Sequence, residues 1–226
     1  MEGRLLLFDK PLTWTSFDVV NKVRSLIRYK LGLRKIKIGH AGTLDPLATG
    51  LLIICTGKMT KTIDQYQAME KEYSGTFYLG QTTPSFDLET KPDHHFPTEH
   101  IQAEMLEKTA FRFVGSQMQI PPIYSAKKIE GERAYEFARR GEQTELKARE
   151  IHISRFDITR YQPPEVDFRI ACSKGTYIRA LARDFGEALG SGAYLKKLRR
   201  ERIGDIKVTD AWKVEDFDRH IKGFLD

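Results

Sequence analysis

The sequence predicts an α+β fold with a mixed sheet, because strand and helix patterns are intermixed along the chain without strict βα alternation. Residues 51–55 form a continuous apolar run that is typical of a buried strand. Apolar and polar residues alternate over 73–80, 151–158 and 166–172, which predicts half-buried strands. These four segments are expected to build most of the sheet.

Helical spacing of apolar residues predicts the helices that flank this sheet. The first covers 16–29 with Ser16 as its N-cap, and the second begins after Thr98 as its cap. A third helix follows Thr176, and the basic segment around 194–200 is expected to form another. The chain shows no internal repeat, so the sequence favours a compact α+β protein.

Composition is that of a globular protein, since 40% of the residues are hydrophobic and 30% are charged. No apolar run approaches the roughly 18 residues of a membrane span, and the apolar patch 5–8 is too short for a signal-peptide core. Cys55 and Cys172 lie outside any metal-binding spacing, so we expect two buried, reduced thiols. We therefore expect a cytoplasmic protein that does not bind a membrane.

Positive charge is concentrated in two parts of the chain, whose net charge is +6. Seven Lys and Arg residues and no acidic residue lie between Val19 and Leu44, and residues 171–202 carry eight basic against three acidic residues. Such clusters are typical of proteins that bind polyanions, because neutralised phosphates release counterions. A solvated basic surface explains the same charges, so charge alone leaves both interpretations open.

The chemistry is expected in segment 39–50, which reads Gly-His-Ala-Gly-Thr-Leu-Asp-Pro-Leu-Ala-Thr-Gly. Its Asp45 stands among small and apolar residues, with no acidic neighbour for many positions. Glycines on both sides allow the backbone to approach a ligand, and Pro46 biases Asp45 away from helical geometry. These features suit a fixed, ionised carboxylate that acts as nucleophile or base, and a simple turn aspartate is the alternative.

This G-H-x-G-x-L-D-P-x-A-x-G pattern resembles the catalytic motif of the TruB family of pseudouridine synthases. Other motifs of that family are matched in the same order over nearly the whole chain. They are D-K-P at 9–11, T-K at 60–61, K-x-Y at 71–73, L-G-x-x-T at 79–83, Q-x-P-P-x-Y-S-A-x-K at 119–128, C-S-x-G-T-Y-I-R at 172–179 and the segment 192–200. The chain departs from the family at 83–87, where T-P-S-F-D replaces T-D-T-x-D, so a role of Asp87 in ordering the active-site arginine stays open.

The resemblance implies a mixed, mainly antiparallel central sheet flanked by helices, the pseudouridine synthase catalytic fold. It implies one catalytic domain over 1–226, with an RNA-gripping insertion at about 115–147 and without the C-terminal PUA-like domain of many relatives. The implied reaction isomerises the uridine at position 55, in the TΨC loop of tRNA, without a metal or redox cofactor. The expected partner is the T stem-loop of tRNA, no protein partner is implied, and a monomer is the default.

The resemblance also assigns roles to single residues. Asp45 starts scission of the N1–C1′ glycosidic bond, and attack at C1′, addition at C6 and removal of a ribose proton stay open as its mode of action. Arg179 is expected to pair with Asp45 and to orient it, while Tyr73 stacks on the uracil and helps to remove the C5 proton. His40 is expected to fill the space that the flipped base vacates or to contact the flipped nucleotide. Phosphate contacts, pocket walls and loop positioning are the roles expected of Lys10, Lys61, Tyr124, Lys127 and Tyr177, and Leu198 is expected to line the pocket beside the base.

Each role has a plainer alternative when the residue is considered alone. Arg179 can contact a phosphate or lie on a solvated helix face, Tyr73 can belong to the core, and His40 can be structural. For the whole chain, the rivals are a non-catalytic tRNA-binding module, a catalytic subunit guided by RNA, and an Asp-dependent glycosidase. The last would require a second catalytic carboxylate, and none stands out near Asp45.

Overall fold

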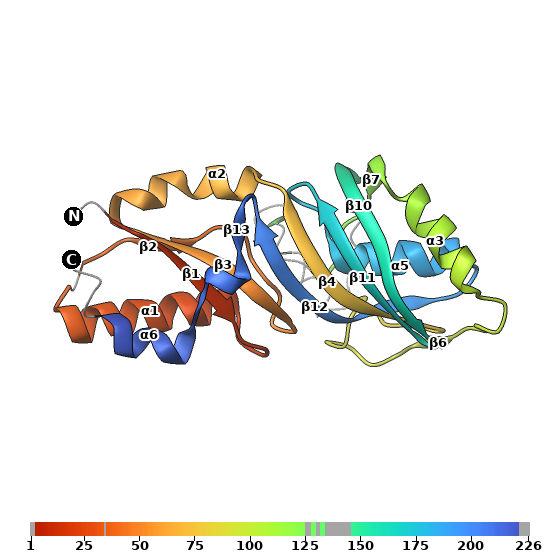
Figure 1. The fold of residues 1–226 in the computed structure, drawn as a ribbon, viewed down its shortest axis with the longest axis horizontal. Helices are drawn as coiled ribbons and strands as arrows, with labels where there is room; N and C mark the ends of the chain where they lie inside the picture. The colour runs from red at the N-terminus through yellow and green to blue at the C-terminus, as the bar shows by residue number, and fades with distance from the viewer. Residues whose placement is uncertain (1–2, 34, 125–127, 130–131, 134–145, 222–226) are drawn as a thin grey trace. The chain divides into compact units, whose positions relative to one another are not determined.

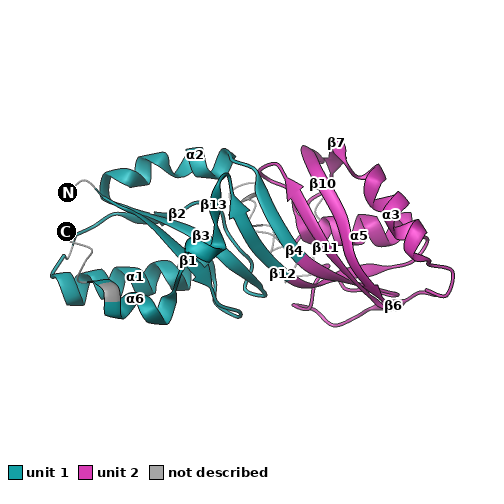
Figure 2. Cartoon of the chain, in the orientation of Figure 1, with its two compact units in different colours: residues 1–74, 198–226 teal, residues 75–197 magenta. Residues whose placement is uncertain are grey.

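The computed structural model describes residues 3–33, 35–124, 128–129, 132–133 and 146–221. The chain forms two compact units, which Figure 2 distinguishes by colour. Unit 1 consists of residues 1–74 and 198–226, and unit 2 consists of residues 75–197. Two strands, β4 (Lys71–Leu79) and β12 (Ala193–Ile203), carry the chain from one unit into the other.

The sheet of unit 1 has the strand order β14-β1-β3-β12. Strand β1 is antiparallel to β3, and β2 is antiparallel to the far end of β3, whereas β14 joins β1 and β12 joins β3 in parallel. The short β13 is antiparallel to β12. The bounds are Leu5–Lys10 for β1, Ile38–His40 for β2, Ala48–Thr56 for β3, Ile206–Lys207 for β13 and Trp212–Lys213 for β14.

Both faces of this sheet are buried, because successive side chains of β1 and β3 point to opposite faces. Phe8 and Ile54 belong to the core cluster that also contains residues of α1 and α6. Ile53 and Cys55 belong to a second cluster, against which Ile63 packs. Figure 1 shows α1 and α6 side by side along the sheet. The helical segments are α1 (Ser16–Leu31), η1 (Gly57–Thr62), α2 (Ile63–Ala68), η2 (Val208–Asp210) and α6 (Val214–His220).

The sheet of unit 2 has the strand order β4-β11-β10-β7. Phe185 of α5 contacts Phe77 of β4 and Phe156 of β10, with ring centroids 5.7 and 5.3 Å apart. These two rings also contact Phe168 of β11, so one aromatic cluster joins α5 to three strands. The bounds are Gln81–Thr82 for β5, His94–His95 for β6, Ala103–Arg112 for α3, Gly115–Gln119 for β7, Lys128–Ile129 for β8, Glu132–Arg133 for β9, Arg149–Gln162 for β10, Glu165–Cys172 for β11 and Ile178–Ala188 for α5.

The predicted fold class is confirmed: the sheet is mixed, mainly antiparallel and flanked by helices. The N-caps were placed wrongly, because Thr15 caps α1 through a capping box with Asp18, and Gln102 rather than Thr98 precedes α3. The two cysteines are buried free thiols, and burial raises the pKa of Cys55. Across the described residues, no helix combines the length and the apolar character needed to cross a membrane.

The predicted helix at 194–200 is wrong, because this segment is the middle of β12. Leu, Lys and Arg favour helices by intrinsic propensity, and Leu195 and Leu198 lie at helical spacing. In the structure, residues 198–200 instead pair in parallel with residues 48–50 of β3. The hydrogen bonds of an interior strand outweigh the weak local preference, as tertiary context commonly does.

Candidate active site

Asp45 lies in a loop, residues 41–47, that connects β2 to the start of β3. The carboxylate-bearing side chain is half-buried. The carbonyl of Asp45 accepts a hydrogen bond of 3.0 Å from the amide of Ala48, which closes a turn over Pro46. This segment, which we call the Asp45 loop, therefore enters the sheet three residues after its aspartate.

The start of α1 holds the Asp45 loop from one side. The hydroxyl of Ser16 donates to the carbonyl of Leu44 at 3.2 Å and accepts from the amide of the same residue at 2.9 Å. The amide of Thr13 donates to the carbonyl of Pro46 at 2.9 Å. Thr13 has a φ of 69°, a rare conformation for a β-branched residue. The chain thus accepts local backbone strain where it meets the Asp45 loop.

Arg200 holds the Asp45 loop through hydrogen bonds to backbone carbonyls. Its buried guanidinium donates through Nε to the carbonyl of Leu51 at 2.7 Å and through Nη2 to the carbonyl of Gly42 at 3.1 Å. Gly50 pairs with Arg200 and has a φ of 104°, and a Cβ there would lie 2.3 Å from the Arg200 carbonyl oxygen. Only glycine allows the two strands to approach this closely.

Lys10, at the end of β1, is fully buried, and its ammonium donates to three backbone carbonyls. These belong to Pro11 at 3.0 Å, Trp14 at 2.6 Å and Pro46 at 3.4 Å. Burial lowers the pKa of Lys10 from 10.5 to about 8, and the negative charge of Asp45 opposes this shift. Lys10 is therefore in electrostatic contact with Asp45 and ties the Asp45 loop to the loop that follows β1.

This pKa predicts how the stability of the protein depends on pH. Between about pH 8 and 10.5 the unfolded chain binds a proton at Lys10 that the folded chain has lost, so the free energy of unfolding rises with pH. The gain from this one group is about 3 kcal/mol over the whole interval. Urea denaturation at several pH values should show this rise for the wild type relative to Lys10→Met, and parallel curves for the two proteins would contradict it.

The other predicted residues of unit 1 occupy distinct places. His40 ends β2, and burial together with the charge of Arg200 lowers its pKa, which favours the neutral imidazole. Leu198 pairs with Ala48 in β12, so it lies on the strand next to the end of the Asp45 loop. Tyr73 is half-buried in β4, and Lys61 is exposed in η1, beyond the opposite end of β3.

In unit 2, the guanidinium of Arg179 is buried and held from several directions. Its Nη2 donates to the carbonyl of Tyr124 at 2.9 Å and its Nη1 to the carbonyl of Ser85 at 3.2 Å. Its Nε lies 3.5 Å from a carboxylate oxygen of Asp87, and both side chains are at most 6% exposed. The side chain extends from the first turn of α5. These contacts fix the guanidinium plane.

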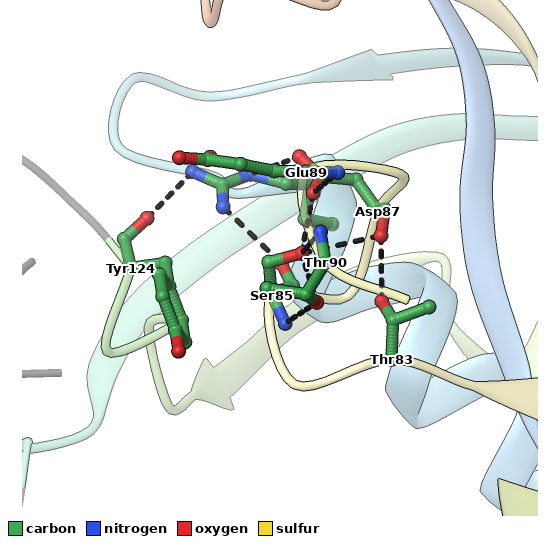
Figure 3. Close-up of polar contacts among 7 residues, drawn as sticks. Thr83, Ser85, Asp87, Glu89, Thr90 and Tyr124 are labelled. Carbon is green, nitrogen blue, oxygen red and sulfur yellow. Dashed lines mark hydrogen bonds and ion pairs between the residues drawn. The ribbon is translucent and has the colours of Figure 1, made fainter. Parts of the chain in front are cut away.

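Asp87 is itself fixed by a tight turn, residues 83–90 (Figure 3). Its carboxylate accepts hydrogen bonds from the hydroxyl of Ser85 at 2.6 Å and from the amide of Glu89 at 2.9 Å. The hydroxyl of Thr83 donates to the carbonyl of Asp87 at 2.7 Å, and Ser85 also contacts the hydroxyl of Thr90. The departure T-P-S-F-D therefore still provides a carboxylate that orders Arg179.

Tyr177 precedes α5 and is joined to β7 through Gln119. The amide of Tyr177 donates to the side chain of Gln119 at 2.9 Å, and its carbonyl accepts from the same side chain at 3.2 Å. Tyr124 contributes its carbonyl to Arg179, and both tyrosine side chains are partly exposed. Lys127 and most of the predicted RNA-gripping insertion lie outside the described residues.

Three residues of these sites were not singled out from the sequence for the roles they have: Ser16, Gln119 and Arg200. Ser16 was expected to cap a helix, and Arg200 was counted as basic charge and as part of the motif segment 192–200, with no role of its own. Their partners are backbone groups 28, 58 and 158 positions away. Local patterns carry no signal for such contacts. Among the described residues, no group of His, Cys, Asp and Glu side chains is arranged to hold a metal ion.

Comparison with known proteins covers nearly the whole chain. Residues 28–178 match the family model described as TruB family pseudouridylate synthase (N terminal domain), and residues 179–222 match the tRNA pseudouridylate synthase B C-terminal domain. The tRNA pseudouridine synthase B of Phocaeicola vulgatus is 57% identical over 216 residues, which are 96% of this chain and 92% of that protein. The protein of the same name from Flavobacterium johnsoniae is 55% identical over 223 residues, which are 98% and 97% of the two chains.

A solved structure shares the fold at lower identity. A chain in the crystal structure of a Cbf5-Nop10-Gar1 complex aligns with a TM-score of 0.73 and 24% identity. The alignment covers 100% of the present chain and 56% of that chain. At 24% identity, the comparison shows that the two chains share a fold and shows nothing more.

Proposed function

The chain belongs to the TruB family of pseudouridylate synthases, and from that premise we propose that it converts one uridine of tRNA to pseudouridine. The proposed target is position 55 in the TΨC loop, in the usual tRNA numbering. Curated relatives that are more than half identical carry the name tRNA pseudouridine synthase B, which supports tRNA as the substrate. The two basic parts of the chain supply charge for such a polyanion.

The observation that carries the proposal is the fixation of the Asp45 loop. Ser16, Lys10 and Arg200 each hydrogen-bond to its backbone, while the Asp45 carboxylate stays half-buried. A structural aspartate in a turn does not need two buried cations, here Lys10 and Arg200, bonded to the backbone of its loop. A reacting carboxylate, in contrast, gains from preorganisation. Asp45 is therefore the group that we propose starts the reaction.

The proposed reaction breaks the N1–C1′ bond, rotates the uracil and forms the C5–C1′ bond, with loss of the C5 proton to solvent and uptake of one proton at N1. The product is an isomer of the substrate, so neither an oxidant nor a second substrate is needed. Arg179 orients the carboxylate, and its pairing with Asp45 stays a prediction. His40 and Leu198 are proposed to contact the flipped nucleotide, whose removal from the stack costs a few kcal/mol.

The test is release of tritium from tRNA transcripts labelled at C5 of uridine, followed by mapping of the modified position. Stoichiometric release, with a single modified uridine in the TΨC loop, is the expected result. Release without modification at that position would contradict the proposed site and leave the isomerase activity standing. Tight tRNA binding without any release would favour a non-catalytic tRNA-binding module.

Tyr73→Phe separates stacking on the base from proton transfer. The phenylalanine ring keeps the stacking surface, which is worth about 1–3 kcal/mol per base, but it has no phenol oxygen to help remove the C5 proton. We expect tRNA affinity to be retained while tritium release slows by about 10²-fold or more, with the glycosidic bond already broken in the stalled complex. Rapid-quench analysis of the RNA detects that state, and full activity of Tyr73→Phe would remove the proposed role.

A catalytic subunit guided by a separate RNA is the second candidate, because the fold also occurs in the Cbf5-Nop10-Gar1 complex. The same assay distinguishes the two, since a stand-alone enzyme modifies a bare tRNA transcript without added RNA or protein. We propose a monomer that acts in the cytoplasm. Sedimentation of the purified protein with and without tRNA tests the monomer.

A further inference from the structure

A second basic site lies on unit 1, at the opposite end of β3 from the Asp45 loop. It is a cavity of about 470 Å³ that is lined by residues 32–33 and 35–37 after α1 and by residues 57, 58, 60 and 61 after β3. Lysines dominate its polar lining: Lys35, Lys37, Lys58 and Lys61. We call it the lysine pocket. Lys61 is a predicted RNA contact, and the other three lysines have no role in the reaction described above.

Among the described residues, no carboxylate compensates the charge of the lysine pocket. All four lysine side chains are exposed, and the described lining contains no carboxylate. Within the described part of the chain, none of the four makes an ion pair, whereas Lys30 pairs with Asp218 at 3.4 Å. Four like charges around one hollow repel each other, and an anion in the hollow relieves this repulsion.

The backbone holds the two lysine-bearing segments together. Ile38 pairs with Thr56 in the β2–β3 ladder, and the amide of Gly57 donates to the carbonyl of Lys37 at 2.8 Å. Gly32 ends α1 with a φ of 69°, which turns the chain into the first segment. The backbone beside Lys37 and Lys58 is thus preformed, which lowers the cost of binding an anion there.

The pocket is too far from Asp45 to serve the reacting base. Strand β3 runs from Ala48 to Thr56, and at about 3.3 Å per residue its ends are about 26 Å apart. Asp45 precedes one end, and the lysine pocket follows the other. An anion bound there belongs to a part of the substrate well removed from the uridine that reacts.

We propose that the lysine pocket binds backbone phosphates of the RNA substrate and anchors the RNA remote from the base site. The proposal rests on the proposed function, because it takes an RNA as the substrate. Lysine ammonium groups are compact, strongly hydrated charges that suit phosphates without reading sequence. The anchor contributes affinity that depends on salt and not on base identity.

The test compares Lys35→Gln/Lys37→Gln with the control Lys91→Gln/Lys108→Gln, which removes the same charge from exposed positions of unit 2. The dissociation constant for unmodified tRNA transcript is measured by filter binding between about 50 and 200 mM salt. For the pocket variant we expect about tenfold weaker binding, and a slope of log K against log salt that is smaller by about 2. Lys58→Glu should weaken binding further, because it places a negative charge beside the same phosphate.

The outcomes separate the inference from the function. If the wild type releases tritium from tRNA while the pocket variant binds with the slope of the control, the lysine pocket is not an RNA anchor. If inorganic phosphate or ATP binds in the pocket at micromolar concentration, and the pocket variant shows an unchanged salt slope for tRNA, the pocket belongs to a small phosphate ligand. That result would overturn the proposal. If the pocket variant shows the expected loss of affinity and slope relative to the control but the wild type releases no tritium, the anchor stands and the proposed enzyme function fails.

Discussion

Asp45→Asn is expected to lower the rate of pseudouridine formation by at least about 10⁴-fold. Asparagine has nearly the shape of aspartate, so the contacts of Lys10, Ser16 and Arg200 to the loop backbone are retained. Its amide, however, is neither a nucleophile nor a base at neutral pH. Tritium release under single-turnover conditions measures the loss, and filter binding checks that tRNA affinity changes by no more than a few fold.

Asp18→Asn is a matched control for this variant. Like Asp45, Asp18 is close enough to Lys10 for its charge to raise the pKa of that lysine, but it belongs to the capping box of α1. Asp18 is the N3 residue of that box, and the amide oxygen of asparagine can still accept the hydrogen bond from the Thr15 amide, so the cost to stability is small. The control should retain turnover, which would assign the effect of Asp45→Asn to chemistry and not to electrostatics around Lys10. Turnover of Asp45→Asn above about 1% of the wild type would contradict the proposed role.

Arg179→Lys is expected to reduce turnover by about 10²- to 10³-fold, the typical effect of losing one preorganised electrostatic donor in an active site. The guanidinium distributes its donors to the carbonyls of Ser85 and Tyr124 and pairs with Asp87. An ammonium is a point charge and cannot reproduce this planar fork. The variant keeps the positive charge, so any loss reports on orientation.

Arg183→Lys, one helical turn further along α5, is the matched control. Its guanidinium lies 4.8 Å from the ring centroid of Phe86 and is partly exposed. We expect turnover within about threefold of the wild type, because exposed cation–π contacts contribute about 0.5–1 kcal/mol. Equal losses in the two variants would mean that α5 as a whole, and not Arg179, is sensitive to substitution.

Periodicity predicted the elements that are buried on one face or on both. The apolar run 51–55 lies within β3, and the alternating segment 166–172 lies within β11, because side-chain direction in a strand follows directly from position. Where the pattern failed, as at 194–200, the strand is set by pairing with β3 about 150 positions earlier. A one-dimensional pattern does not contain that partner.

The candidate site also contains features that the sequence predicts and features that depend on distant partners. A fixed carboxylate at Asp45 could be predicted from its neighbours, because glycine and proline shape a loop locally, and its catalytic role stays a prediction. The residues that fix the loop could not, since Ser16 and Arg200 act on backbone carbonyls and amides that every residue has. In unit 2 the motif identified Arg179, but its contacts to Ser85 and Tyr124 depend on how three distant segments meet.

The discontinuous make-up of unit 1 has a consequence for biosynthesis. Unit 2 is one uninterrupted stretch of chain, whereas the sheet of unit 1 needs residues 198–200 beside β3 and Trp212 beside Phe8. As the polypeptide leaves the ribosome, the segment bearing Asp45 emerges early, whereas Arg200, which hydrogen-bonds to its loop, is synthesised more than 150 residues later. Pairing over such a separation closes a long loop and is slow. The proposed catalytic carboxylate thus acquires its working geometry only after β12 has been synthesised, so nascent chains that stop before β12 carry the Asp45 motif without an organised site.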